Sequence, residues 1–399
     1  MTRLGWSERP IAALANYENG YPFKPHQLGD TGTPIVRIRQ LNDPSAGFDH
    51  YEGDLEPKYQ LSDGDLIFSW SGSLSVGFWT RGNAFLNQHL FRVDPASGVD
   101  KRWLAYALTW SVAHFEGFMH GSAMTHITKP MMKAVRAPVP PVDEQRAIAD
   151  YLDRETARID TLIEEQQRLI EMLRERRGAA VEDAVSTVAI SGPRFKHLIH
   201  KVRQGWSPQC HAWPADGVQT WAVLKAGAAN GGAFRPMENK ELPAEEPPRP
   251  EVVVRQGDLV VSRANTRELV GSAAVVESEF PRLMLCDKLY AFELDDDRAD
   301  PRYVATVLGS RRWRDLIKIE ATGASHSMLN ISQSDIVNLP MPVPPLDEQH
   351  RVVSRLGAQT SKIDKLIAET ERFIELSRER RAALITAAVT GQIDVREVA

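Results

Sequence analysis

Residues 137–145 read APVPPVDEQ, and residues 341–349 read MPVPPLDEQ. The similarity continues without a gap from 137–185 to 341–389 at a constant offset of 204, and 24 of the 49 aligned pairs are identical. Unrelated helical sequences share charge and leucine, but they do not share a long ungapped register with a proline-rich lead. The chain is therefore built from two copies of one unit, which predicts approximate two-fold symmetry and a partner bound twice.

The repeated segments are predicted to be long helices. Between Asp143 and Ser186 there is no proline and a single glycine, and apolar residues recur at steps of three and four. Pro141 and Pro345 precede the two patterns, and Asp143 and Asp347 are well placed to cap them. Some 44 residues would rise roughly 65 Å, and each apolar stripe is too narrow for a helix buried on all sides. We expect the two helices to pack together as an antiparallel coiled coil; the alternative is two separate helices on unrelated cores.

The blocks before each helix correspond more loosely. LSDGDLIFSWSGS (61–73) matches VRQGDLVVSRANT (254–266) around Gly-Asp-Leu, and HGSAMTHIT (120–128) parallels TGASHSMLNIS (322–332). Short alternating strands, turns and a helix in each block predict two mixed α/β domains, so the fold class is α+β with pseudo-two-fold symmetry. The predicted segments are a first domain at 1–136, a helix segment at 137–189, a second domain at 190–341 and a second helix segment at 342–399.

Composition limits the class of protein. The chain has 399 residues, of which 42% are hydrophobic, enough for two or three cores. The net charge of −5 arises from the acidic segment 137–189, so the neutral domains can still carry a basic face. Without an apolar run of about eighteen residues or a basic, apolar leader, we expect a soluble cytoplasmic protein. The two cysteines, Cys210 and Cys286, are expected to be reduced, unreactive thiols.

No catalytic signature is found along the chain. There is no G-x-x-x-x-G-K-[ST] phosphate loop and no N-P-P-[FY] or D-P-P-[YF] tetrapeptide of adenine methyltransferases. The histidines and cysteines do not have the spacing of a metal site. We therefore expect no catalytic residues, no metal and no cofactor in this chain.

Two divergent domains, each followed by P-x-P-P-hydrophobic-x-E-Q and a long helix ending in R-E-R-R, resemble the specificity subunit of type I restriction–modification systems. The resemblance covers the whole chain, although the first domain departs from the pattern in its HGSAM loop. It implies that each domain, there called a target recognition domain, grips one half of a bipartite site in the major groove of double-stranded DNA. It also implies that the helices set the spacing and dock two modification subunits, which bind S-adenosylmethionine and methylate adenine. Two restriction subunits, using ATP and Mg²⁺, join where the system also cleaves DNA.

The expected DNA contacts lie in loops rich in amide, hydroxyl and guanidinium groups. Arginine and asparagine can pair bidentately with guanine and adenine edges, and hydroxyl groups suit phosphates. For any one of these residues, a solvated or turn-forming role is an equal alternative. The candidates in the first domain are Lys24, His26, Ser69, Trp70, Ser71, Ser73, His120 and Ser122. Those in the second are Gln209, His211, Arg263, Asn265, Arg267, Ser325 and His326.

Charged and amide residues that recur in both helix segments are the candidates for partner contact. The alternatives are a solvated charged face for the arginines and local capping of the first helical turn for the Glu-Gln pairs. The candidates are Glu144, Gln145, Arg174, Arg177, Glu348, Gln349, Arg378 and Arg381. Two other functions compete with the DNA-recognition subunit: a coiled-coil scaffold without DNA readout, and a stand-alone DNA methyltransferase or nuclease with degenerate motifs.

Overall fold

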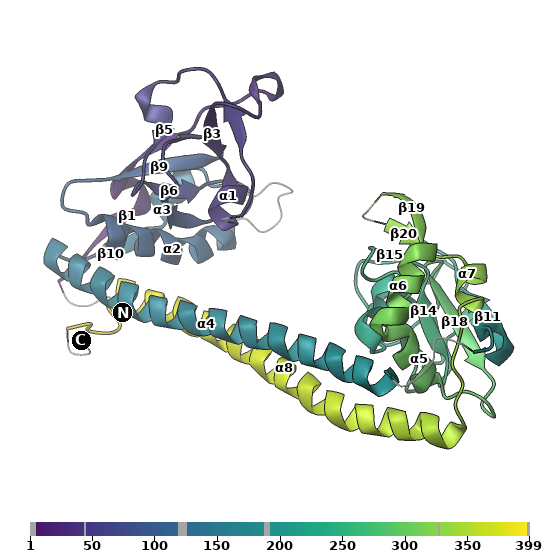
Figure 1. Cartoon of the computed structure of the whole chain (residues 1–399). Helices are drawn as coiled ribbons and strands as arrows, with labels where there is room; N and C mark the ends of the chain where they lie inside the picture. Colours follow the sequence, from purple (N-terminus) through teal and green to yellow (C-terminus); the bar gives the residue numbers. More distant parts are fainter. Residues whose placement is uncertain (1–4, 44, 119–125, 187–191, 326–327, 397–399) are drawn as a thin grey trace. The chain divides into compact units, whose positions relative to one another are not determined.

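The computed structural model describes residues 5–43, 45–118, 126–186, 192–325 and 328–396 (Figure 1). The chain divides into two compact units: unit 1 is Met1–Gln167 with Glu371–Ala399, and unit 2 is Arg168–Thr370. Each unit contains one mixed domain and a part of both long helices, which confirms the predicted fold class. The four segment boundaries drawn from the sequence stay a prediction.

In unit 1 the domain is built on two four-stranded sheets. The first has the order β2-β9-β6-β7 and is antiparallel throughout. Helix α2 contacts β6, β7 and β9, and Trp103 and Leu104 of α2 share a core with Phe68 of β6 (Figure 1). The second sheet has the order β4-β3-β8-β5, in which β3 and β8 run parallel. The elements are β1 (Ser7–Pro10), η1 (Ile11–Ala13), β2 (Ala15–Asn19), η2 (Pro25–Gln27), β3 (Thr33–Val36), α1 (Ile38–Asn42), β4 (Asp49–Tyr51), η3 (Pro57–Tyr59), β5 (Gln60–Leu61), β6 (Leu66–Ser69), β7 (Val76–Phe78), β8 (Ala84–Leu86), β9 (Leu90–Pro95), α2 (Lys101–Phe118), α3 (Lys129–Ala134) and β10 (Arg136–Val139).

Unit 2 repeats this plan. Its main sheet, β11-β18-β14-β16, is antiparallel, and its second sheet, β13-β12-β17, contains a parallel pair, β12 with β17. A third sheet has the order β15-β20-β19. The elements are η4 (Phe195–Leu198), β11 (Ile199–Gln204), β12 (Ala222–Leu224), η5 (Ala226–Gly232), β13 (Asn239–Glu241), η6 (Pro250–Val252), β14 (Leu259–Ser262), β15 (Ala264–Asn265), β16 (Ala273–Val275), β17 (Leu283–Met284), β18 (Leu289–Leu294), α5 (Pro301–Gly309), α6 (Arg311–Glu320), β19 (Thr322–Ser325), β20 (Met328–Asn330) and α7 (Gln333–Val337).

The repeated segments form two 44-residue helices, α4 (Val142–Val185) and α8 (Leu346–Val389). Both begin two residues earlier than capping by Asp143 and Asp347 predicts. Asp143 and Asp347 therefore lie in the first turn, where a carboxylate still interacts favourably with the helix dipole, and not at the cap.

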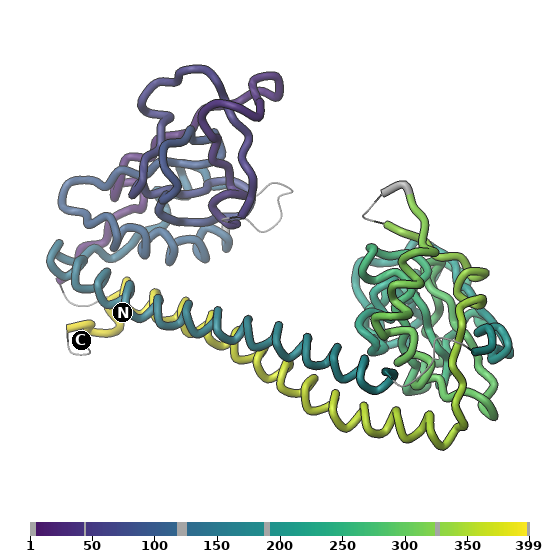
Figure 2. Tube along the Cα trace, in the orientation of Figure 1, coloured from purple at the N-terminus to yellow at the C-terminus, as the bar shows by residue number. Residues whose placement is uncertain are grey.

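Within each unit the two helices run antiparallel. In unit 1, Ile148 of α4 shares a core with Ile385 of α8, and Asp160 forms an ion pair with Arg381 at 2.9 Å. Figure 2 follows the chain after α8 back beside the start of α4, where Arg396 lies 3.7 Å from Glu144. As the residue number rises along α4, the number of the residue that it contacts near or in α8 falls, so the two helices run in opposite directions.

Unit 2 has the same arrangement. Arg177 pairs with Asp364 at 2.8 Å, and Val185 of α4 shares a core with Val352 of α8. The predicted antiparallel packing is confirmed inside each unit.

Candidate nucleic-acid interface

The Gly-Asp-Leu sequence in each domain forms the turn into a buried strand. Gly64 and Gly257 have φ values of +88° and +89°, a region in which a side chain is strained. The Asp65 carboxylate accepts the backbone N–H of Ser62 at 2.8 Å. Asp258 accepts that of Arg255 at 2.6 Å. These residues serve the turn, and the strands β6 and β14 run from it to the opposite end of each main sheet.

In unit 1, β6 ends at the place where three segments of the chain meet. The backbone N–H of Trp70, the first residue after β6, donates to the carbonyl of His89 at 3.3 Å. The carbonyl of Trp70 accepts the N–H of Ile127 at 2.7 Å, and Ser71 bridges to His126. The strand end thus lies between the turn before β9 and the segment that follows the HGSAM loop.

Unit 2 has the same backbone arrangement after β14. The N–H of Arg263 donates to the carbonyl of Lys288 at 2.8 Å, and the carbonyl of Arg263 accepts the N–H of Ile331 at 2.9 Å. Asn265 in β15 pairs with Leu329 in β20, and β20 pairs with β19, which ends at Ser325. Arg263 therefore occupies the position in unit 2 that Trp70 occupies in unit 1. His120, Ser122 and His326 lie outside the described residues.

Two of the predicted DNA-contact residues have side-chain polar atoms that form hydrogen bonds within the domain. Ser69 is fully buried; its hydroxyl donates to the carbonyl of Ser73 at 2.6 Å and accepts the N–H of Ser75 at 2.7 Å. The amide nitrogen of Asn265 donates to the side chain of Asn230 at 3.1 Å, and its oxygen accepts the N–H of Thr266 at 2.9 Å. Both residues stabilise the turns that follow β6 and β14.

The other candidates near the two strand ends have polar groups at the surface. The hydroxyl of Ser71 lies 2.9 Å from Nδ1 of His89, and that of Ser73 accepts a hydrogen bond from Asn42 at 3.4 Å. Trp70 and Arg263 are half-buried. The Trp70 indole donates an N–H to the carbonyl of Gln88, and the Arg263 guanidinium donates one to the carbonyl of Asp287. Arg267 is exposed and has no hydrogen-bond partner in the part of the chain that the structure describes.

The candidates near the start of each domain lie in the segments that lead from the main sheet to the second sheet, between β2 and β3 and between β11 and β12. Lys24 and His26 are exposed at η2, and Gln209 is exposed. His211 is half-buried and stacks on Trp213, with ring centroids 4.4 Å apart and an interplanar angle of 8°. These four residues stay predictions, and their arrangement does not by itself argue for a base contact.

The two recurring glutamines are not available to a partner. Gln145 and Gln349 are fully buried in their own units. The Gln349 amide nitrogen donates to the carbonyls of Arg298 and Pro344 at 2.9 and 2.8 Å, and its oxygen accepts the N–H of Asp300 at 2.9 Å. The predicted partner contact is wrong, because the Gln349 amide joins the domain to its helix.

Gln145 repeats this arrangement in unit 1. Its amide nitrogen donates to the carbonyls of Gly98 and Pro140 at 3.1 and 2.8 Å, and its oxygen accepts the N–H of Asp100 at 2.7 Å. The recurrence of Glu-Gln in the sequence is therefore explained, for the glutamine, by an internal joint.

The remaining charged candidates on the helices divide by burial. Arg177 and Arg381 are half-buried and pair with the opposite helix, and Glu144 accepts a hydrogen bond from the Trp6 indole at 3.2 Å. These three side chains have internal roles. The exposed candidates are Arg174, Glu348 and Arg378.

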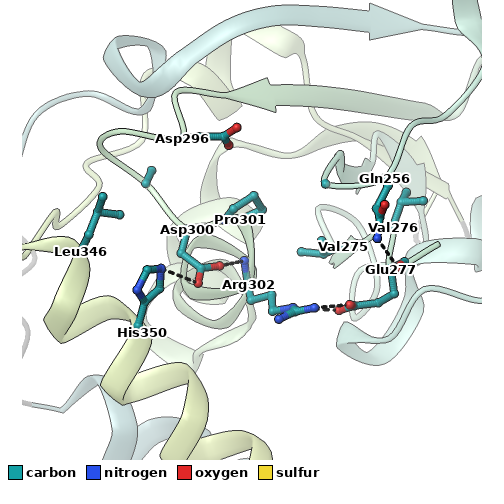
Figure 3. A pocket seen from close by; sticks show the side chains of 12 residues that line it. Gln256, Val275, Val276, Glu277, Asp296, Asp300, Pro301, Arg302, Leu346 and His350 are labelled. Atoms are coloured by element: carbon teal, nitrogen blue, oxygen red, sulfur yellow. Dashed lines mark hydrogen bonds and ion pairs between the residues drawn. The ribbon is translucent and has the colours of Figure 1, made fainter. Parts of the chain in front are cut away.

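A cavity of about 310 Å³ lies at the other end of the unit 2 sheet, beside the start of α8 (Figure 3). Glu277 there forms an ion pair with Arg302, and Asp300 accepts the backbone N–H of Arg302 at 2.7 Å and lies 3.5 Å from His350. Gln256, which lines it, precedes β14, whereas Arg263 follows that strand. The cavity is thus remote from the strand end, and the carboxylates of Glu277 and Asp300 in its lining are paired. Among the described residues, no three acidic, histidine or cysteine side chains are grouped to hold a metal.

The turns that precede β9 and β18 also lie at the ends of β6 and β14, and they are not among the residues predicted from the sequence. Gln88 and His89 occupy the first, and Asp287 and Lys288 occupy the second. The signal was present as LNQHLF (86–91) against LCDKLY (285–290), which share two leucines and a final aromatic residue.

Comparisons with known proteins agree with this architecture. A family model described as "Type I restriction modification DNA specificity domain" matches residues 4–172. The EcoEI type I restriction enzyme specificity subunit from Escherichia coli is 31% identical over 196 residues, which are 49% of this chain and 33% of that subunit. The EcoBI specificity subunit, also from Escherichia coli, is 19% identical over 418 residues, covering 97% of this chain and 86% of that one.

A solved chain from work described as "Structural basis underlying complex assembly and conformational transition of the type I R-M system" covers 98% of this chain and 100% of its own length. Its TM-score is 0.66 at 15% identity, which shows a common fold. Among the described residues, no helix is long and apolar enough to cross a membrane. Residues 4–172 therefore belong to the family of type I restriction modification DNA specificity domains, and the chain as a whole, with its two mixed domains and two repeated helices, is similar to the specificity subunits of type I restriction enzymes.

Proposed function

We propose that each mixed domain of this subunit reads one half of a bipartite DNA site in the major groove. The two halves differ in sequence and are separated by bases that neither domain contacts. Within this proposal, the segments that meet at the ends of β6 and β14 form the two reading faces.

A single observation carries the proposal: one backbone arrangement holds different side chains in the two units. Trp70 and Arg263 make equivalent backbone hydrogen bonds to His89 and Lys288. A common frame keeps the geometry of approach to the groove, while the side chains on and around that frame differ between the two units, which changes which base edges can be bound. Two readers of unlike half-sites need this combination.

The helices support the second part of the proposal, which is the spacing of the half-sites. A continuous helix of 44 residues is far stiffer than a flexible linker of that length. Readers that bind one side of a duplex must be spaced near whole helical turns, about 34 Å each. Two helices that pack together and are joined by ion pairs suit that requirement.

We also propose that two modification subunits dock on the helices, using the exposed Arg174, Glu348 and Arg378. S-adenosylmethionine belongs to those subunits, and ATP and Mg²⁺ belong to restriction subunits where the system has them. The complex works in the cytoplasm, on chromosomal and incoming DNA. The competing function, a scaffold without DNA readout, predicts a complex whose methylation ignores base order.

The test is methylation mapping with the assembled complex. This chain is co-expressed with its modification subunits, and methylated adenines are mapped on a randomised plasmid library. We expect one split motif, and we expect no methyl transfer by the purified chain alone. In a chimera, residues 1–136 are replaced by the same block of another family member. One half of the motif should change; a change in both halves, or no motif for the wild type, would defeat the proposal.

A further inference from the structure

We propose that the turns Asn87–His89 and Cys286–Lys288, hereafter the pre-β9 and pre-β18 turns, carry base-reading side chains of the two domains. Trp70 and Arg263 are then positioning residues that hold these turns. This inference rests on the proposed function and adds the chemistry of the bases read.

The pre-β9 turn is fixed by several hydrogen bonds. The N–H of Gln88 donates to the carbonyl of Tyr21, and the N–H of Leu90 donates to that of Asn87, both at 3.0 Å. The indole N–H of Trp70 donates to the carbonyl of Gln88, also at 3.0 Å. With its backbone groups occupied in this way, the turn presents its side chains from a rigid base.

The pre-β18 turn is fixed at the same positions. The N–H of Leu289 donates to the carbonyl of Cys286 at 3.2 Å. The carbonyl of Asp287 accepts two side-chain N–H groups at 3.3 Å, one from Arg263 and one from Gln204. Asp287 and Gln88 are the equivalent residues of the two turns, so Trp70 and Arg263 donate to the same carbonyl position by different chemistry.

Because Trp70 and Arg263 hold the turns, the side chains available to contact bases are those of the turns themselves. Asp287 and Lys288 are adjacent and half-buried, yet neither side chain has a hydrogen bond or an ion pair within the described ranges. Two opposite charges on a fixed turn that leave each other unpaired are available to a ligand with complementary donors and acceptors. In the pre-β9 turn, the Gln88 amide lies 3.3 Å from Nε2 of His89 at the surface.

The donor and acceptor groups of these side chains indicate which bases they can bind. An ammonium group binds the O6 and N7 acceptors of guanine, and a carboxylate accepts from the N4 amino group of cytosine. Lys288 and Asp287 therefore suit a G·C pair in the second half-site. An amide pairs bidentately with N6 and N7 of adenine, so Gln88 suits an A·T pair in the first half-site.

The experiment uses the complex with modification subunits and a set of duplexes in which each base pair of the mapped site is replaced in turn. Initial methylation rates give the discrimination at every position. Lys288→Ala should lower discrimination at one G·C pair of the second half-site by about ten- to a hundred-fold, with other positions unchanged. Lys288→Arg should keep the guanine preference. The matched control is Lys201→Ala, an exposed lysine of β11 near the opposite end of the same sheet.

A positioning role for Arg263 has its own signature. Arg263→Ala should weaken discrimination at the same base pair as Lys288→Ala, and the double variant should lose little more than either single one, because the two residues act as one unit. Gln88→Ala should affect one A·T pair of the first half-site.

Several results would overturn the inference. A uniform fall in rate on all duplexes for Lys288→Ala would make it a phosphate contact, and an unchanged profile would remove the turn from the interface. Either result would leave the proposed function intact if the wild-type complex still methylates a split motif. A wild type without base preference would instead end both.

Discussion

The guanidinium of Arg177 in α4 lies 2.8 Å from the carboxylate of Asp364 in α8. The counterpart pair, Arg381 with Asp160, has a separation of 2.9 Å, and both members are displaced by the repeat offset of 204. Each aspartate needs an arginine from the other copy. This mutual dependence explains why Asp160 and the last arginine of R-E-R-R are kept in both repeats.

The first prediction concerns this pair. The side chains of Arg177 and Asp364 are 29% and 50% exposed, so solvent and salt screen their attraction. Arg177→Asp should destabilise the helix pair by about 0.3–1 kcal/mol, and Asp364→Arg in the same chain should restore most of the loss. Thermal unfolding of the single and double variants at low salt and in about 1 M NaCl measures the coupling. A coupling that does not shrink with salt would argue against an ionic cause.

A second prediction follows from the buried joint at Gln349. Gln349→Ala leaves the N–H of Asp300 and the carbonyls of Arg298 and Pro344 without their partner. A buried unsatisfied backbone group costs about 1–3 kcal/mol, so we expect a loss of about 2–4 kcal/mol, less than additive because water can enter.

The neighbouring residue supplies the control for Gln349. Glu348 is exposed, and Glu348→Ala should change the free energy of unfolding by less than about 0.5 kcal/mol. Urea unfolding followed by tryptophan fluorescence compares the two variants. Equal losses for both would show that the first turn of α8, and not the buried amide, holds the domain.

The architecture could be predicted from the sequence because it depends on patterns that extend over many residues. The ungapped repeat and the three- and four-residue steps define α4 and α8, and the Gly-Asp-Leu match locates β6 and β14. The ends of those strands were also found, since Trp70 and Arg263 directly follow them.

The roles of single polar residues could not be predicted in this way. Ser69, Asn265 and Gln349 have ordinary loop or helix neighbours in the sequence, and their side chains form hydrogen bonds with residues that are 4, 35 and 51 positions away. Lys288 could not be predicted for a different reason. It follows Asp287 directly, so the turn carries no cluster of basic residues that would mark it in the sequence. Hydrogen-bond partners are a property of tertiary contacts, which a periodic pattern does not contain.

The third prediction concerns Cys286, the first residue of the pre-β18 turn. Burial raises the pKa of its thiol to about 11. The thiolate is the reactive form, so about one thiol in a thousand is reactive near pH 8, and the rate should rise with pH toward 11. Iodoacetamide labelling followed by peptide mass spectrometry should therefore modify Cys286 far more slowly in the folded chain than in guanidinium. Equal rates in the two states would show that the turn opens freely.

The last prediction tests the close approach that fixes the same turn. A Cβ on Gly205 would overlap the carbonyl of Leu285 and crowd the N–H of Cys286, all backbone atoms that cannot move alone. Gly205→Ala should destabilise unit 2 and lower methylation through the second half-site, leaving discrimination in the first unchanged. The control is Gly357→Ala in α8, where a Cβ meets nothing within 4 Å and should stabilise the helix by about 0.5–1 kcal/mol. Because both variants add one methyl group to unit 2, opposite signs in their thermal midpoints isolate the backbone contact, and a tolerated Gly205→Ala would mean that the pre-β18 turn is not held as described.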